Sequence, residues 1–481
     1  MPHFTKVGQL PQSCYAAFVV NASTEPAEIR LDRGGQDIDV SHALYRTNPG
    51  DATLTPVHGP IAAGESAVLF ISDQTSNAVG GTWSHLYTPC PTGIEPAVRF
   101  DLPAGTRRDV AFHLTSTAPV NVVTMYPFGG ARSFLPTASL ALPVAGWGKE
   151  HVLLNAWEAN DAEPSAQIMA AEDDTVVTIN PVAAIERGPG IEPGPAHVPV
   201  TYRMNKGEYL QLVQWNELTG SIVTSDKPTS IVGGHGCPFL PSTQGTCDIL
   251  AQQLPSFEQW GNEYVGVGYR PRLGDEYESL YYRIVAAKDD TRLDYDPAVP
   301  PGAPVHLSAG EVATFTSGTG EAFVVRSQDL EHPIYLGAYM TGGSAYSGEG
   351  DPEYVNVVPS AQYLNTYSFY ADPSYGDTSL VIVRAKTNGE FKDVWLECAG
   401  NLTGFQPIGT RGQYEFVRVD LARKGRTGQT FGEGKVCRNG LHRMKSEGPF
   451  GATVWGWDYA ASYAYPGGMG LRRLASTSLV H

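Results

Sequence analysis

Ile168-Met-Ala-Ala-Glu-Asp-Asp-Thr175 and Ile284-Val-Ala-Ala-Lys-Asp-Asp-Thr291 are two copies of one pattern, and this pattern decides the fold class. In each copy a short apolar run ends at an Asp-Asp pair, and a second run begins at threonine. Aspartate favours tight turns because its carboxylate bonds to nearby backbone groups. The pattern therefore predicts a β-hairpin, and Ile382-Val-Arg-Ala-Lys-Thr-Asn-Gly389 is a looser third copy.

Further segments recur around this hairpin at intervals of roughly 110 residues, which is typical of a repeat protein. One is a dipeptide ending in proline and followed by an aromatic residue: Leu142-Pro143 with Trp147, Leu254-Pro255 with Trp260, and Val358-Pro359 with Tyr363. Another is a Gly-Glu turn: Gly64-Glu65, Gly207-Glu208 and Gly310-Glu311, with Gly412-Gln413 as a variant. Because the aromatic residue recurs once per repeat, we expect it to be a structural anchor rather than a ligand site.

A second type of hairpin is expected where a short polar segment ends in proline. The copies are Ser116–Pro119, Ser225–Pro228, Leu330–Pro333 and Ser446–Pro449. Proline lacks an N–H donor and is tolerated at the start of a strand. Each segment therefore predicts a turn followed by a new strand.

These repeats predict an all-β fold of tandem antiparallel four-stranded units in about four double repeats. The expected units are residues 1–135 with an insertion at 75–105, then 136–245, 246–350 and 351–470, followed by a tail at 471–481. Helix is scarce, and only Ile249–Gln253 has a briefly helical pattern. We favour a β-propeller-like closed array, in which the strand Tyr459–Tyr465 completes the first unit. A row of β-sandwiches is the alternative.

The charge balance and hydropathy exclude two classes of partner. The formal net charge is −17 and charged residues make up 17% of the chain. An acidic surface repels phosphate backbones, so no nucleic-acid partner is expected. We also expect no membrane insertion, because no stretch of 18 apolar residues is present. The basic clusters Arg423-Lys424-Gly425-Arg426 and Arg472-Arg473 are interpreted as solvated loop and tail charges.

Six cysteines indicate an oxidising compartment. They form three local groups, so we predict Cys14–Cys90, Cys237–Cys247 and Cys398–Cys437 among the 15 pairings that six cysteines allow. Six free buried thiols are the alternative. The chain begins Met-Pro-His-Phe-Thr-Lys without an apolar signal core. We therefore expect an extracellular or cell-surface protein whose secretion signal is absent from this chain.

Several long motifs resemble the N-terminal domain of the IgG-Fc-binding protein family. They are Gly220-Ser-Ile-Val-Thr-Ser-Asp-Lys-Pro228, Ile231-Val-Gly-Gly-His-Gly-Cys237, Thr246-Cys-Asp248, Trp260-Gly-Asn-Glu-Tyr-Val265, Gly350-Asp-Pro352 and Tyr459-Ala-Ala-Ser-Tyr-Ala-Tyr-Pro-Gly-Gly468. The resemblance extends from about Cys14 to Gly468, and the Ala-, Gly-, Pro- and Arg-rich composition suggests a bacterial-type member. It implies a secreted or surface-displayed binding protein. Immunoglobulin binding is not carried over to this chain.

No sequence motif points to catalysis. The 12 histidines contain no His-Glu-x-x-His, and the chain has no Gly-x-Ser-x-Gly elbow and no P-loop. We therefore predict a non-catalytic module, not an enzyme, that recognises an extracellular protein or glycan. A self-assembling protein of a filament, sheath or surface layer is one alternative. A propeller-type glycan-active enzyme is a second.

Two metal sites are considered, although we expect no cofactor. His235, Cys237, Cys247 and Asp248 could bind zinc, but their spacing favours a disulfide instead. Acidic turns could supply oxygen ligands to calcium. These calcium candidates are Glu172, Asp173, Asp174, Asp289, Asp290, Asp351 and Glu353. The simpler interpretation is that they are turn residues.

An aromatic stripe near the C-terminus is the last candidate site. Trp455, Trp457 and Tyr459 alternate with other residues and so fall on one face of a strand, and Tyr463 and Tyr465 follow them. Exposed, the stripe would stack on sugar rings or anchor a protein partner. Buried, it would be core, which is the interpretation we favour.

Overall fold

The computed structural model describes residues 12–47, 53–75, 87–133, 135–274 and 277–479. In these parts of the chain the regular structure is β-strand, with short 3-10 helices between strands. The strand pairs in these ranges are antiparallel except for β6 with β7, which are parallel. The all-β antiparallel class predicted from the sequence is therefore confirmed. No helix in the described ranges has the length and apolar character needed to cross a membrane.

Four sheets of the same design form the body of the molecule. In each, strands that are far apart in sequence pair in the same relative order. From outermost to innermost they are β6 (Ser66–Asp73), β1 (Tyr15–Asn21), β10 (Val120–Tyr126) and β11 (Thr137–Ala141); β16 (Glu208–Val213), β13 (Pro164–Ala170), β17 (Ile222–His235) and β18 (Leu250–Leu254); β23 (Val312–Gly318), β20 (Ser279–Ala286), β25 (Ile334–Met340) and β26 (Glu353–Asn356); and β32 (Tyr414–Arg423), β28 (Asp377–Ala385), β34 (Gly440–Asp458) and β35 (Ala461–Pro466).

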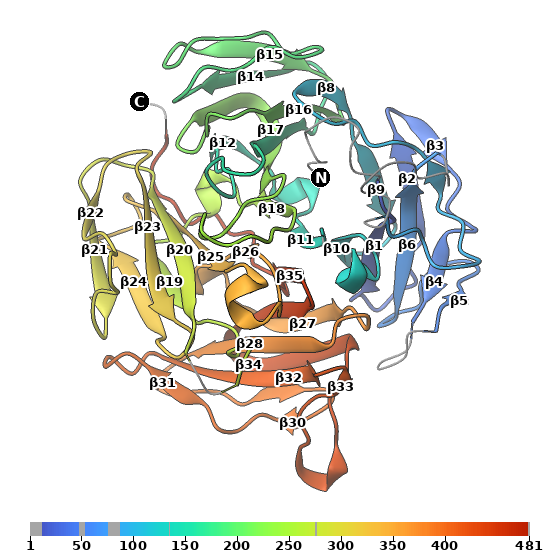
Figure 1. The fold of residues 1–481 in the computed structure, drawn as a ribbon, viewed down its shortest axis with the longest axis vertical. Helices are drawn as coiled ribbons and strands as arrows, with labels where there is room; N and C mark the ends of the chain where they lie inside the picture. The colour runs from blue at the N-terminus through green and yellow to red at the C-terminus, as the bar shows by residue number, and fades with distance from the viewer. Residues whose placement is uncertain (1–11, 48–52, 76–86, 134, 275–276, 480–481) are drawn as a thin grey trace.

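A second layer of strands accompanies each of these sheets. Its members are β2 (Ile29–Arg33), β3 (Gln36–Ile38) and β9 (Phe112–Ser116); β12 (Gly148–Val152), β14 (Thr175–Asn180) and β15 (Val200–Met204); β19 (Glu263–Gly266), β21 (Thr291–Asp296), β22 (His306–Leu307) and β24 (Phe323–Ser327); and β27 (Leu364–Ala371), β29 (Val394–Leu396) and β30 (Gly400–Asn401). The remaining short strands are β4 (Leu44–Arg46), β5 (Thr55–Pro56), β7 (Val98–Arg99), β8 (Arg107–Val110), β31 (Gln406–Ile408) and β33 (Arg426–Thr427). Figure 1 shows the resulting four groups of sheets around the centre of the molecule.

The repeated turns share one backbone conformation. Asp174, Asp290 and Asn388 have φ angles of 56°, 52° and 51°. Among L-residues, aspartate and asparagine adopt this left-handed conformation most readily. The glycines of the Gly-Glu turns also have positive φ angles, 73° at Gly64 and 76° at Gly207. The repeated motifs therefore mark equivalent turns.

The turn and new strand predicted at the proline segments are confirmed in the first and third units, where the new strand is β10 or β25. The predicted hairpin is wrong, because the strand before the turn pairs elsewhere, β9 with β2 and β24 with β21. In the second and fourth units the segment lies inside one long strand, β17 or β34. The first half of β17 pairs with β12 and β14, and its second half pairs with β13 and β18. The chain thus crosses from one layer to the other instead of reversing. Pro228 lies where the partners change, so its missing donor interrupts no ladder.

Two other predictions are corrected by strand pairing. Ile249–Gln253, expected to be briefly helical, belongs largely to strand β18 (Leu250–Leu254). The predicted closing strand Tyr459–Tyr465 corresponds to β35, but β35 pairs with β34 of the last unit and not with the first sheet. The sequence pattern identified the strands and could not identify their partners.

The innermost strands β11, β18, β26 and β35 lie beside one another at the centre of the molecule (Figure 1). Each has a ladder on one side only, so polar side chains bond to the edge that faces the centre. The Gln253 Oε1 accepts from Leu142 N at 2.7 Å, and the Ser139 Oγ accepts from Gln253 N at 3.0 Å. The Asn356 Nδ2 donates to Gln253 O at 2.9 Å. These bonds join the inner strands of different units.

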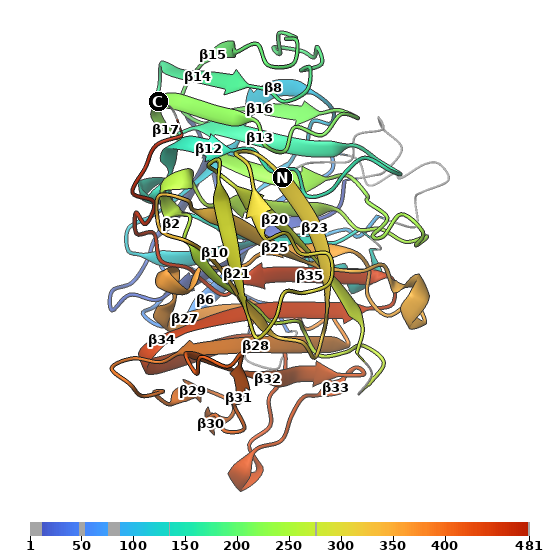
Figure 2. The same cartoon turned by 90° about the vertical axis from the view of Figure 1, so that its left-hand side faces the viewer.

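Apolar cores join each unit to its neighbours. One cluster joins the first and fourth units, where the rings of Phe18 and Tyr370 stack at 4.2 Å. Two others join the third unit to the fourth and to the second. The first and second units are joined by the ladder between β8 and β16. The sheets of different units therefore pack as one body, as the side view in Figure 2 also shows.

The C-terminal segment after β35 is held against several units. Gly470 N donates to Gln362 O at 2.8 Å, Leu474 N to Glu258 O at 2.7 Å, and Leu479 N to the Glu150 carboxylate at 2.8 Å. The segment expected to be a tail, from residue 471, therefore packs against the rest of the protein up to residue 479, the last one described. The side chain of Arg473 remains 80% exposed, as expected for a solvated charge.

The recurring aromatic residues anchor equivalent one-turn 3-10 helices, η3 (Val144–Gly146), η4 (Phe257–Gln259) and η6 (Ser360–Gln362). Trp147 and Trp260 donate their indole N–H to Leu142 O and Pro255 O at 3.1 and 3.3 Å. Trp260 is 1% exposed, whereas Trp147 is half-buried. The two tryptophans thus have the same local contacts and different burial.

Replacing Trp260 with alanine should lower the free energy of unfolding by about 3–5 kcal/mol, because it leaves a large cavity. Trp147→Ala, at the equivalent half-buried position, should cost clearly less. Thermal melts followed by circular dichroism measure both. Equal losses for the two variants would contradict the assigned difference in burial.

Candidate binding site

Three disulfides cross-link the chain in the pairing predicted from the sequence. Cys14 is bonded to Cys90, Cys237 to Cys247 and Cys398 to Cys437, and no free cysteine remains. Their sequence separations are 76, 10 and 39 residues. The first bond therefore ties down the longest segment, and a loop held in this way can keep a fixed surface shape.

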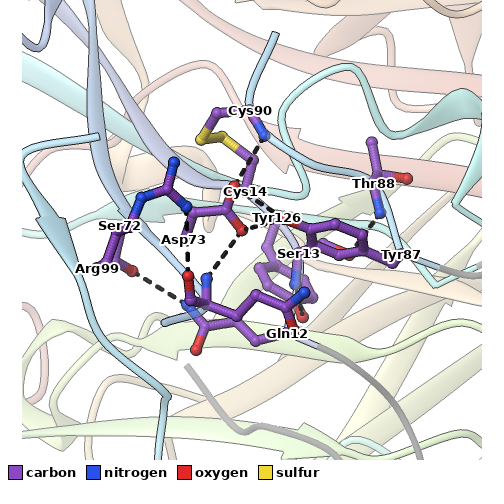
Figure 3. The surroundings of a disulfide bond; sticks show 11 residues. Gln12, Ser13, Cys14, Ser72, Asp73, Tyr87, Thr88, Cys90, Arg99 and Tyr126 are labelled. Carbon is purple, nitrogen blue, oxygen red and sulfur yellow. Dashed lines mark hydrogen bonds between the residues drawn. A yellow bond between two sulfur atoms is a disulfide. The ribbon is translucent and has the colours of Figure 1, made fainter. Parts of the chain in front are cut away.

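The Cys14–Cys90 bond fixes the loop that follows β6 against the residues that precede β1 (Figure 3). Cys14 N donates to Thr88 O at 2.9 Å, and Thr88 N donates to the Ser13 hydroxyl at 3.0 Å. Ser13 N in turn donates to the Tyr126 hydroxyl at 3.0 Å. The loop is thus joined to β10 as well as to the N-terminal segment.

Asp73, at the end of β6, is the hub of this arrangement (Figure 3). Its carboxylate accepts from Gln74 N at 2.8 Å, from the Tyr87 hydroxyl at 3.1 Å and from Cys90 N at 3.1 Å. Partial burial and the neighbouring Asp73 charge raise the pKa of Tyr87 to about 12. Tyr87 therefore stays protonated at neutral pH and donates to the carboxylate.

A cavity of about 370 Å³ lies against this hub. Its lining residues are Asp73, Tyr87, Pro89, Cys90, Pro91, Thr92, Gly93, Ile94 and Arg99. The Arg99 residue is exposed, and its guanidinium donates a hydrogen bond to Gln74 O at 3.4 Å. A guanidinium, a ring and a prolyl surface in one fixed hollow suit the recognition of a polar group on a partner. We call this hollow the unit-one pocket.

Sequence reasoning found part of this site. It placed a turn-rich insertion at 75–105 and tied it to Cys14 through Cys90. It missed Asp73, Tyr87 and Arg99, because β6, the loop and β7 meet only in the folded chain. Residues 76–86 of the insertion lie outside the described residues.

In the alternative zinc site at Cys237 and Cys247, His235 is not available as a ligand. His235 Nδ1 accepts from Cys237 N at 3.1 Å, and Nε2 donates to Glu158 O at 3.1 Å. Both ring nitrogens are therefore engaged, and burial lowers the pKa of His235 to about 3. Asp248 points elsewhere and accepts from Ser462 N at 2.8 Å. Asp161 instead lies within 4.8 Å of both sulfur atoms.

The acidic turns act as turn residues in the structure. Asp173 accepts from Lys206 N at 3.0 Å, and the equivalent Asp289 accepts from Ala309 N at 2.9 Å. Asp174 forms an exposed ion pair with Arg203. In the described residues, these acids do not assemble into a compact group of three ligand atoms. Of the other calcium candidates, Asp351 and Glu353 are buried near the centre of the molecule, whereas Glu172 and Asp290 lie in the turns and are not buried.

The aromatic stripe is mostly core. Trp455, Trp457, Tyr463 and Tyr465 are each at most 3% exposed, which contradicts a ligand-stacking role for these four. Trp455 and Trp457 pack against Tyr269 of the third unit. Tyr459 lies at the turn between β34 and β35 and is 65% exposed. The stripe therefore joins the third and fourth units and exposes one ring.

Comparison with known proteins gives two matches. The model of a family described as IgGFc binding protein matches residues 137–456. The human protein called IgGFc-binding protein is 28% identical over 185 residues, which cover 37% of this chain and 3% of that protein. The chain therefore spans a small fraction of the relative's length. The family match begins after the unit-one pocket.

Alkylation of the unfolded, non-reduced protein should add no label, because all six cysteines are in disulfides. After reduction, six labels should appear in the intact mass. Label at Cys237 and Cys247 before reduction would instead show that these two are free thiolates able to bind metal. Peptide mapping identifies which cysteines react.

Removing the first disulfide with Cys14→Ala and Cys90→Ala should lower stability by about 2–5 kcal/mol, because the unfolded chain is no longer constrained. The loop around residues 87–99 should also become sensitive to limited proteolysis. The double variant Cys398→Ala/Cys437→Ala is the matched control and should leave that loop protected. Equal protection of residues 87–99 in both variants would show that hydrogen bonds alone hold the pocket.

Proposed function

Because the chain belongs to the IgGFc-binding protein family, we propose that it is a non-catalytic, extracellular protein-binding module. Family membership is the observation that carries this proposal. Three disulfides support a location outside the reducing cytosol.

We propose that the four units form a closed, propeller-like ring that serves as a rigid platform. The contacts among the inner strands and the shared cores between neighbouring units support this arrangement. A rigid platform favours recognition because its loops lose little conformational entropy when a partner binds. Turns of equivalent backbone in each unit can then carry different surface residues without altering the scaffold.

We propose the unit-one pocket as the recognition site. Its hub is buried and saturated with hydrogen bonds, whereas Arg99 at the edge is exposed. An exposed guanidinium beside a fixed hollow can pair with a carboxylate of a partner protein. Binding there requires no movement of the scaffold.

The partner class proposed is an extracellular protein. The human relative carries IgG Fc in its name, so an Fc fragment is a suitable first probe, with the matching Fab as control. A glycan partner and self-assembly remain rival proposals for this chain. Binding on a glycan array, or polymers in light scattering, would favour them.

Biolayer interferometry with the immobilised chain tests the proposal against Fc, Fab and a panel of secreted proteins. We expect saturable binding to one protein probe. Arg99→Ala should weaken that binding at least tenfold, which corresponds to about 1.4 kcal/mol, because it removes the charged edge of the pocket. Arg30→Ala, an exposed arginine on β2 of the same unit, is the matched control and should bind normally. Equal binding by both variants would place recognition elsewhere on the molecule.

A further inference from the structure

Three carboxyl groups are buried where the four inner strands meet. Asp248 and Glu353 are 0% exposed and Asp351 is 2% exposed. Glu353 belongs to β26, and the other two precede β18 and β26. Burying a charged carboxylate is costly unless a partner compensates for the lost water. The hydrogen bonds and charges around each carboxyl group therefore decide whether it is charged or protonated.

Gln252 of β18 and Glu353 contact the backbone of the same three residues. The Gln252 Nε2 is close to Ala138 O, Tyr354 O and Ala464 O, at 2.8, 3.0 and 3.0 Å. Glu353 accepts from Tyr354 N at 2.8 Å and also faces the backbone N–H groups of Ala138 and Ala464. The amide and the carboxylate are therefore neighbours on the central axis, in contact with three different inner strands.

Several buried oxygen atoms near the axis lack a hydrogen-bond donor among the described residues. An amide nitrogen has two hydrogens, yet three carbonyl oxygens lie around Gln252 Nε2. Within the described chain, Asp248 Oδ1, Gln252 Oε1 and Glu353 Oε2 are buried and accept no hydrogen bond. Thr137 also lies beside Glu353 and, with the backbone N–H groups, favours its charged form. Gln252 is 1% exposed and uncharged. Its unpaired Oε1 is therefore an observation separate from the acidic residues.

The buried cation nearest to these groups is already engaged. The Arg272 Nε donates to the Glu278 carboxylate at 3.0 Å, its Nη1 donates to Thr341 O and Glu349 O at 2.9 and 2.8 Å, and its Nη2 donates to the Thr341 hydroxyl at 2.8 Å. Arg272 also lowers the pKa of Asp351, so it partly compensates that one group. Asp248 accepts one hydrogen bond, from Ser462 N, and faces the charges of Asp351 and Glu353.

We propose that the axis binds one hard cation of the calcium class between Asp248, Gln252 and Glu353. Calcium takes carboxylate, amide and main-chain oxygen ligands, and these are the groups present. Zinc is disfavoured because no cysteine or histidine joins the group. Asp351 does not complete a compact carboxylate triad, since the acidic ligand atoms do not all lie within 4.8 Å. The cation would link the inner strands β18 and β26 and is distinct from the exposed acidic turns.

Protons are the rival occupant. Burial raises the pKa of Asp248 and Glu353, and it raises the pKa of Asp351 to about 6. A carboxyl with a raised folded pKa stabilises the fold at low pH, and this stability is lost as pH rises through that pKa. Protonation alone thus predicts that the melting temperature falls between pH 5 and pH 8. It also predicts that added calcium does not change the melting temperature.

The test compares melting temperatures in excess chelator and in millimolar calcium at pH 8 and at pH 5, with metal content measured after dialysis. We expect about one calcium per chain and a rise of several degrees at pH 8 that shrinks at pH 5, where protons compete. The Asp248→Asn and Glu353→Gln variants should lose the calcium-dependent rise. Asp289→Asn, in an exposed turn, is the matched control and should keep it.

Absence of bound calcium in the wild-type protein, with a melting temperature unchanged by calcium at pH 8, would overturn the proposal. Metal content of the wild type does not depend on any variant folding. Partner binding is assayed separately by interferometry with chelator present. Loss of the cation proposal would therefore leave the binding proposal standing.

Discussion

The structure depends on how four sheet edges meet at one axis. Each inner strand forms a ladder on one side, and the other edge carries backbone N–H and C=O groups that cannot pair in a regular ladder across the axis. Such an edge, left exposed, would be a site for aggregation. Here the side chains of Gln252, Gln253 and Asn356 supply the missing hydrogen bonds. The polar side chains at the centre of an otherwise apolar body are therefore a consequence of the arrangement of the sheets.

The same constraint explains why loops cover one end of the axis. The disulfide-closed loop between Cys237 and Cys247 bonds to the segment after β25, where Gly342 N donates to Leu240 O at 2.8 Å. That segment bonds to the turn between β34 and β35, where Gly350 N donates to Asp458 O at 2.8 Å. Loops from three units are thus joined above buried carboxyls. Excluding water from these groups strengthens every electrostatic interaction among them.

Sequence patterns predicted local structure well and long-range pairing poorly. Turns at Asp174, Asp290 and Asn388 were predictable because the left-handed conformation restricts the residue type. The disulfide pairs were predictable because the cysteines are locally grouped. The partner of β35 and the crossing of β17 between layers were not, because an apolar strand is compatible with several neighbouring sheets. Likewise Asp73, Tyr87 and Arg99 carry no motif, and only the folded loop brings them together.

The division between scaffold and recognition follows from these constraints. Residues that fix turns, inner strands and unit contacts cannot change without cost, and most of them lie within the family match at 137–456. The unit-one pocket lies outside that match and is built on a loop whose shape depends on one disulfide and one buried carboxylate. A loop anchored in this way can change its exposed residues while its hub keeps the backbone fixed. The proposed recognition site thus lies in the first unit, and the family match covers most of the other three.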